Sequence, residues 1–93
     1  MVTAIILLNV ERKKIKTVAE QLVDIEGITE VYSVTGRFDL VAIIRVGKDD
    51  DLAELVTDEL ADLEGILATE TMIAFRAYSK HDLDRMFAIG FEK

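Results

Sequence analysis

Cysteine is absent from this sequence of 93 residues, and histidine occurs only once, at His81. Without cysteine there is no disulfide, thiolate metal site or thiol nucleophile, which is typical of a reducing compartment such as the cytoplasm. A metal site would have to combine the one histidine with carboxylates, and no ligand spacing of that kind is present. We therefore expect neither a metal nor any other cofactor.

Glycine, aromatic residues and long apolar runs are also scarce. Five scattered glycines do not form the glycine-rich loop of a phosphate-binding site. The predicted central strands are aliphatic, whereas RNA-binding sheets need exposed aromatic side chains there. The apolar start, MVTAIILLNV, stops at Glu11, well short of the ~20 residues of a membrane span, and it has no basic start and no cleavage site. We expect a cytoplasmic protein with no membrane partner.

Basic residues are fewer than acidic ones, 11 against 18, which gives a formal net charge of -7. Such a surface repels phosphate backbones. The basic cluster Arg12, Lys13, Lys14 and Lys16 is too short to reverse that field, and it is better explained as the solvated start of a helix. Direct binding to nucleic acid is therefore not expected.

The chain contains an internal repeat. VAEQLVDIEGI (18–28) aligns with VTDELADLEGI (56–66), with six of the eleven positions identical, and at the same offset AII (4–6) aligns with AII (42–44). In each copy a short aliphatic segment (3–10 or 40–46) predicts a buried strand. An apolar stripe with spacings of three and four then predicts a helix. The stripes are Ile15, Val18, Ala19, Leu22 and Ile25 in one copy and Leu52, Leu55, Val56, Leu60 and Leu63 in the other.

Each predicted helix ends at a glycine, Gly27 or Gly65, and a second strand follows (28–35 or 66–78). Asp51 with Glu54 is a plausible capping pair for the second helix. Two right-handed strand–helix–strand units side by side give a four-stranded antiparallel sheet with two helices on one face. The prediction is a single α+β domain over residues 1–93, with the ferredoxin-like βαββαβ plan.

The last residues, SKHDLDRMFAIGFEK (79–93), predict a short C-terminal helix with Ser79 and Asp82 as a capping box. Two helices cover only one face of the sheet, yet Ile5 and Leu7 place aliphatic side chains on the other face. Monomers rarely leave so large an apolar patch in water. We therefore expect two sheets to pack face to face in a homodimer.

The turn between the two copies allows two interpretations. In the first, Thr35, Gly36, Arg37 and Phe38 form a two-residue hairpin, with Gly36 at positive φ and Asp39 capping the amides of the turn. In the second, the turn binds a free amino acid. Backbone N–H groups and the Arg37 guanidinium would take the carboxylate and Asp39 the ammonium. Thr69 and Thr71 would add hydroxyls if they approach the turn of a neighbouring subunit.

No catalytic constellation is present, because the serines and threonines lack a suitably placed histidine. A binding or assembly function is therefore favoured over an enzyme. The alternative is a small dimeric α/β-barrel enzyme, such as a cofactor-free monooxygenase or isomerase, which would need polar catalytic groups between sheet and helices. A third possibility is a purely structural assembly module.

The residues also resemble a known family. DIEGITEVYS followed by VTGRFDLVAIIRV, and the later LEGILATETMIAF, are similar to the ligand-binding module of Lrp/AsnC transcriptional regulators. The resemblance covers essentially the whole chain. It implies a dimeric α/β barrel that assembles into octamers or similar rings, with an amino acid bound between dimers. The implied ligand-binding residues are Thr35, Gly36, Arg37, Phe38 and Asp39, with Thr69 and Thr71 added from the last strand.

Full-length members of that family begin with a helix-turn-helix domain, whereas this sequence starts at the first strand of the sensing module. The resemblance therefore implies a stand-alone module that regulates transcription or amino-acid metabolism through ligand-dependent assembly. Such a module would not bind DNA directly and would act through a DNA-binding relative.

Overall fold

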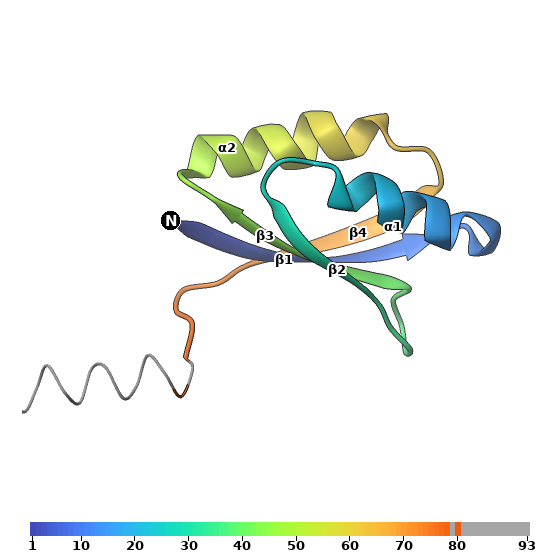
Figure 1. Cartoon of the computed structure of the whole chain (residues 1–93), viewed down its shortest axis with the longest axis horizontal. Helices are drawn as coiled ribbons and strands as arrows, with labels where there is room; N and C mark the ends of the chain where they lie inside the picture. The colour runs from blue at the N-terminus through green and yellow to red at the C-terminus, as the bar shows by residue number, and fades with distance from the viewer. Residues whose placement is uncertain (79, 81–93) are drawn as a thin grey trace, which may run out of the picture.

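The computed structural model describes residues 1–78 and residue 80 (Figure 1). The predicted C-terminal helix, its predicted capping box and His81 lie outside the described residues. The strands are β1 (Val2–Val10), β2 (Ile28–Ser33), β3 (Leu40–Val46) and β4 (Ile66–Ile73). The helical segments are η1 (Arg12–Lys14), α1 (Ile15–Val23), α2 (Asp49–Glu54), η2 (Leu55–Glu59) and η3 (Leu60–Asp62).

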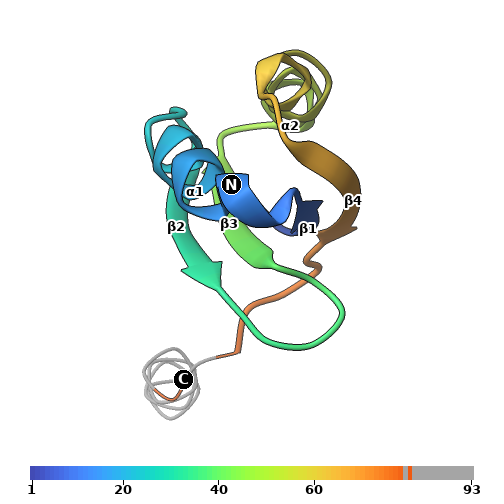
Figure 2. The ribbon, with the colours of Figure 1, turned by 90° about the vertical axis from the view of Figure 1, so that its right-hand side faces the viewer.

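The four strands form one sheet in the order β2-β3-β1-β4, and every neighbouring pair is antiparallel. Both helices lie on the same side of this sheet, as Figures 1 and 2 show. This is the ferredoxin-like βαββαβ arrangement, so the predicted fold class is confirmed. The repeat explains it, because each copy supplies one strand–helix–strand unit.

Alternation along β1 decides which side chains enter the core. Ala4, Ile6, Leu8 and Val10 are buried under the helices, while the residues between them are only half-buried. Strand β3 alternates in the same way, with Leu40, Ala42 and Ile44 buried. The period of two therefore gives the central strands one face against the helices and a second, aliphatic face that no other element of residues 1–78 covers.

The predicted helical stripes supply the other half of the core. Val18 and Leu22 of α1 are fully buried, and Leu52, Leu55 and Leu60 are buried along the second helical segment. That segment is not one regular α-helix, because η2 is a π-turn and η3 a 3₁₀-turn. The predicted capping pair is wrong: Lys48 is the N-cap, no side chain caps the helix, and Asp51 lies in its first turn.

Gly65 has the positive φ that the sequence predicts, +99°, where residues with a side chain are strained. It is also tightly packed, because a Cβ placed there would lie 2.9 Å from Cδ of Lys14. Gly27, with a φ of +103°, follows the first helix in the same conformation. The prediction that these glycines end the helices is wrong, because α1 ends at Val23 and η3 at Asp62, and the glycines lie in the turns that follow.

The edge strands are shorter than the sequence suggests. Strand β2 ends at Ser33 rather than at residue 35, and β4 ends at Ile73 rather than at residue 78. The helices also leave β4 uncovered, since every residue from Leu67 to Ile73 is exposed. An exposed strand at the edge of a sheet has unpaired backbone groups, which favour pairing with another chain.

Candidate functional site

The turn that carries five of the predicted ligand-binding residues spans residues 34–39. The backbone N–H of Val34 donates to the carbonyl of Asp39 at 3.0 Å, which closes the loop at its base. The predicted two-residue hairpin is therefore wrong, because the strands separate earlier. Gly36 does have the expected positive φ, +110°, and no heavy atom lies within 4 Å of where its Cβ would be.

Asp39 is held at the base of this turn by the first strand. Its Oδ2 accepts a hydrogen bond from the backbone N–H of Val10 at 2.9 Å, and its own N–H donates to the carbonyl of Leu8 at 2.9 Å. The carboxylate thus continues the β1–β3 ladder one step beyond the pair Leu8–Leu40. The expectation that Asp39 caps the amides of its own turn is wrong, since the bonded amide belongs to a residue 29 positions away.

The rest of the turn presents polar groups to solvent. Thr35, Gly36 and Arg37 are exposed, and Phe38 is half-buried. In the described part of the chain Arg37 takes part in no ion pair. A guanidinium, the backbone amides of an open glycine turn and one fixed carboxylate are therefore within one short loop. This combination of donors and an acceptor can bind a molecule that carries both a carboxylate and an ammonium.

The two predicted threonines lie elsewhere in the chain's fold. Thr69 and Thr71 of β4 pair with Leu8 and Ile6 of β1, so they share the helix-facing side of the sheet. Strand β1 separates them from β3 and its turn. Thr69 lines a small hollow of about 230 Å³ under the second helical segment, together with Val56 and Leu60. One chain therefore brings the five turn residues together but not the threonines.

The open face of the sheet carries rows of paired side chains. In one row Tyr32, Val41, Leu7 and Glu70 follow one another across the four strands, and in the next Glu30, Ile43, Ile5 and Met72 do so. The four central members, Ile5, Leu7, Val41 and Ile43, are half-buried aliphatic residues. We call these four the aliphatic face. Sequence reasoning had already predicted that this surface is apolar.

A polar network borders the aliphatic face along β2. Arg45 donates to Oγ1 of Thr29 at 2.9 Å and lies 3.9 Å from the Glu30 carboxylate. The Tyr32 hydroxyl donates to the same carboxylate. This hydrogen bond, together with the negative charge of Glu30, raises the pKa of Tyr32 above its usual value.

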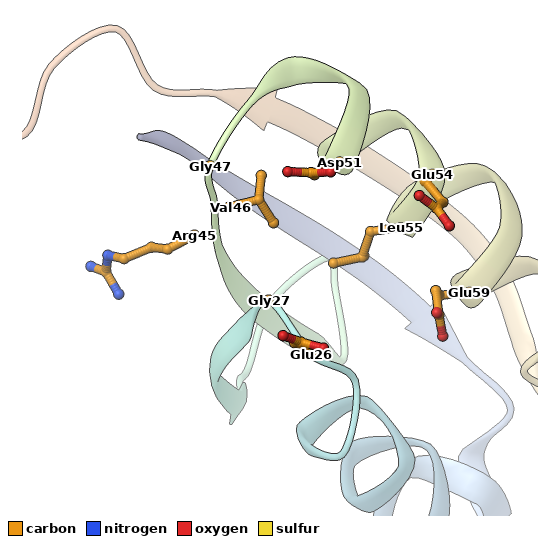
Figure 3. Close-up of a pocket in the computed structure, with 9 residues that line it drawn as sticks. All are labelled: Glu26, Gly27, Arg45, Val46, Gly47, Asp51, Glu54, Leu55 and Glu59. Carbon is orange, nitrogen blue, oxygen red and sulfur yellow. The ribbon is translucent and has the colours of Figure 1, made fainter.

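Sequence reasoning missed an acidic groove of about 440 Å³ on the helix side (Figure 3). Glu26 approaches it from the end of the first helical unit, and Asp51, Glu54 and Glu59 approach it from the second. Arg45, on its border, points away from it. Only the acidic run at 49–51 indicated this groove in the sequence, because Glu26 on its other side is distant from that run. Among the described residues no group of side chains is arranged to hold a metal ion.

The space between sheet and helices bears on the enzyme alternative. Every buried residue in the described part of the chain is hydrophobic, and none is polar or charged. General acid–base chemistry requires a positioned polar group within reach of the substrate. The interior described here therefore offers no catalytic set of the kind that a dimeric α/β-barrel enzyme needs.

The topology defines a ferredoxin-like α+β domain, and its sheet carries an aliphatic face opposite the helices. A family model described as the Lrp/AsnC ligand binding domain matches residues 3–83. The chain therefore belongs to the Lrp/AsnC ligand-binding domain family, as its sequence predicts.

Several similar proteins are named HTH-type transcriptional regulators. The HTH-type transcriptional regulator FL11 of Pyrococcus furiosus is 34% identical over 79 residues, which are 85% of this chain and 52% of the relative. The crystal structure of TTHA0845 from Thermus thermophilus is 39% identical with a TM-score of 0.80, over 86% of this chain and 100% of that one.

A third similar structure is the complex of the transcriptional regulator NMB0573 from Neisseria meningitidis with L-Met. It has a TM-score of 0.75 over 84% of this chain and 52% of that chain, and at 14% identity the likeness shows the fold alone. This chain spans about half the length of the curated relatives it matches. No helix in residues 1–78 is long and apolar enough to cross a membrane.

Proposed function

We propose that this domain is a non-enzymatic sensor that binds a free amino acid at the 34–39 turn and regulates transcription or amino-acid metabolism through its assembly. The observation that carries the proposal is the composition of the turn. It holds an exposed Arg37 without an ion pair in the described residues, the open Gly36 and the anchored carboxylate of Asp39. Membership of a ligand-binding domain family supports the same function.

The binding chemistry follows from the charges of an amino acid. Its carboxylate is matched by the guanidinium of Arg37 and the amides of the turn, since charge-assisted hydrogen bonds are the strongest available there. Its ammonium is matched by Oδ1 of Asp39, because Oδ2 already accepts from Val10. Anchoring fixes the position of the carboxylate before the ligand arrives, which reduces the entropy lost on binding.

Assembly is the second part of the proposal. The aliphatic face is covered by the same face of a second copy, and the homodimers assemble further into an octamer or similar ring. Within one chain Thr69 and Thr71 lie two strands from the turn and cannot contact a ligand there. In the proposed ring they reach the ligand from a neighbouring copy instead. A ligand held between subunits stabilises the assembled form by its differential affinity for it.

Regulation in this scheme passes through a partner. The charge of -7 opposes direct contact with DNA, so the domain works in the cytoplasm with a DNA-binding relative of the same family. The similar proteins named above include such regulators, among them FL11.

A purely structural module is the competing function, and the bond between Asp39 and Val10 favours it. In that case Asp39 serves only to extend the ladder, and the turn makes contacts between subunits. The two functions differ in whether an amino acid binds, and a direct screen separates them.

The test is a thermal-shift screen of the purified protein against the twenty amino acids, with light scattering to follow the size of the oligomer. We expect one or a few amino acids to raise Tm, and we expect Arg37→Ala to remove that shift. Large assemblies that respond to no amino acid would refute the sensor function and support the structural one.

A further inference from the structure

The segment after β4 exposes two aromatic side chains. Residues 74–78, AFRAY, are called the arm here. The backbone N–H of Ala74 donates to the carbonyl of Thr3 at 2.9 Å, which is the last backbone hydrogen bond of the arm to the sheet. Beyond it, Phe75 is 103% exposed and Tyr78 is 72% exposed. Two fully or largely exposed aromatic rings within four positions are a large apolar surface to leave in water.

The direction of the arm indicates which surface it can reach. Figures 1 and 2 both show it leaving β4 on the side of the sheet that faces away from the helices. The aliphatic face lies on that same side, between the strand that the arm follows and β2. Met72, the last residue of β4 on the open face, is 46% exposed and continues the apolar surface towards the arm.

We propose that the arm of each copy reaches across and packs its two aromatic rings on the sheet edge of a second copy, so that the two arms form a reciprocal clasp. This inference rests on the proposed face-to-face dimer and adds a second contact to it. Stacked sheets lie about 10 Å apart. Ala74 is held by the sheet, and the four extended residues after it span up to about 14 Å. Tyr78 can therefore cross that gap, while Phe75, next to the anchor, lies within it and faces the second copy from there.

The first test is the dimer dissociation constant of Phe75→Ser/Tyr78→Ser, measured by analytical ultracentrifugation. The matched control is Arg76→Ser, which removes an exposed residue between the two rings. Because burying an aromatic side chain is worth about one to two factors of ten in a binding constant, we expect a rise of about 10-fold or more for the double variant and none for the control. An unchanged constant in the double variant overturns the clasp.

The second test shows which copy the arm contacts. A photoreactive p-benzoylphenylalanine is placed at Tyr78, and copies carrying it are mixed with heavier, tagged copies that lack it. Crosslinks between light and heavy copies support the clasp, whereas crosslinks confined within one chain overturn it. If the unaltered protein is monomeric at all concentrations, the proposed dimer has failed and the clasp with it. A dimer that tolerates loss of both rings refutes the clasp alone.

Discussion

Replacing Asp39 separates the structural role of its carboxylate from its proposed role in the ligand site. The side chain is the acceptor for the N–H of Val10, a residue that is only 4% exposed. Asp39→Ala leaves this N–H without a partner, and an unsatisfied buried amide costs about 1–3 kcal/mol. In a domain of this size each kcal/mol lowers Tm by about 4–8 °C. We therefore expect Asp39→Ala to lower Tm by about 4–24 °C.

Asp39→Asn keeps an oxygen that can accept from Val10 but removes the negative charge. A hydrogen bond to a neutral acceptor is worth about 1 kcal/mol less than one to a charged acceptor, so this variant should lose only about 1 kcal/mol. It should nevertheless bind no amino acid, since the ammonium has lost its counter-charge. Asp39→Ala should therefore lower the free energy of unfolding markedly, whereas Asp39→Asn should abolish binding with little loss of stability.

The assay combines urea unfolding with calorimetric titration of the amino acid found in the screen. Arg37→Ala serves as the control for stability, because its exposed side chain forms no ion pair in the described residues and should change stability by less than about 0.5 kcal/mol. If Asp39→Ala unfolds at the same urea concentration as the unaltered protein, Asp39 does not anchor β1. If Asp39→Asn binds with unchanged affinity, the carboxylate does not hold the ligand.

Three further predictions concern the turn, the aliphatic face and the polar network. Arg37→Lys should weaken amino-acid binding about tenfold or more in calorimetry, because a lysine cannot make the bidentate contact, whereas equal affinity would exclude that contact. Ile43→Asp should convert dimers to monomers in sedimentation, and the exposed helix variant Gln21→Asp should not; dimers in both would place the interface elsewhere. Glu30→Gln should lower the pKa of Tyr32 towards its usual value, because it removes the charged hydrogen-bond acceptor and the negative charge that raise this pKa. The pKa is measured by ultraviolet absorbance in a protein whose other tyrosine is replaced by phenylalanine. An unchanged pKa would contradict the hydrogen bond between Tyr32 and Glu30.

Much of the fold could be predicted from local patterns. The predicted strand 40–46 coincides with β3, and the buried residues Val18 and Leu22 belong to the predicted stripe of the first helix. These elements were predictable because the spacing of apolar residues, two in a strand and 3.6 in a helix, can be seen within a short stretch of sequence. The positive φ of Gly27 and Gly65 was predictable for a related reason, since positive φ restricts the choice of residue at a single position. The exact ends of the helices, at Val23 and Asp62, were not predicted.

The candidate site was only partly predictable. The composition of the turn pointed to residues 35–39, but the sequence overestimated how far β2 extends and gave Asp39 the wrong hydrogen-bond partner. The acidic groove went unnoticed because residues from both helical units meet there. In each case the missing information was a contact between segments distant in the chain, which local periodicity does not contain.

The sequence by itself determined the order of strands and helices, the aliphatic core and the duplicated plan, because these follow from hydrophobic spacing and from a repeat visible in the residues. Only the tertiary structure decided that the carboxylate of Asp39 extends the β1–β3 ladder, that β4 is left uncovered and that the arm leaves on the open side of the sheet. The physical reason is that hydrophobic burial follows the local pattern of apolar residues. The partner of a hydrogen bond, the exposure of a strand and the path of the arm depend instead on which distant segments of the chain meet.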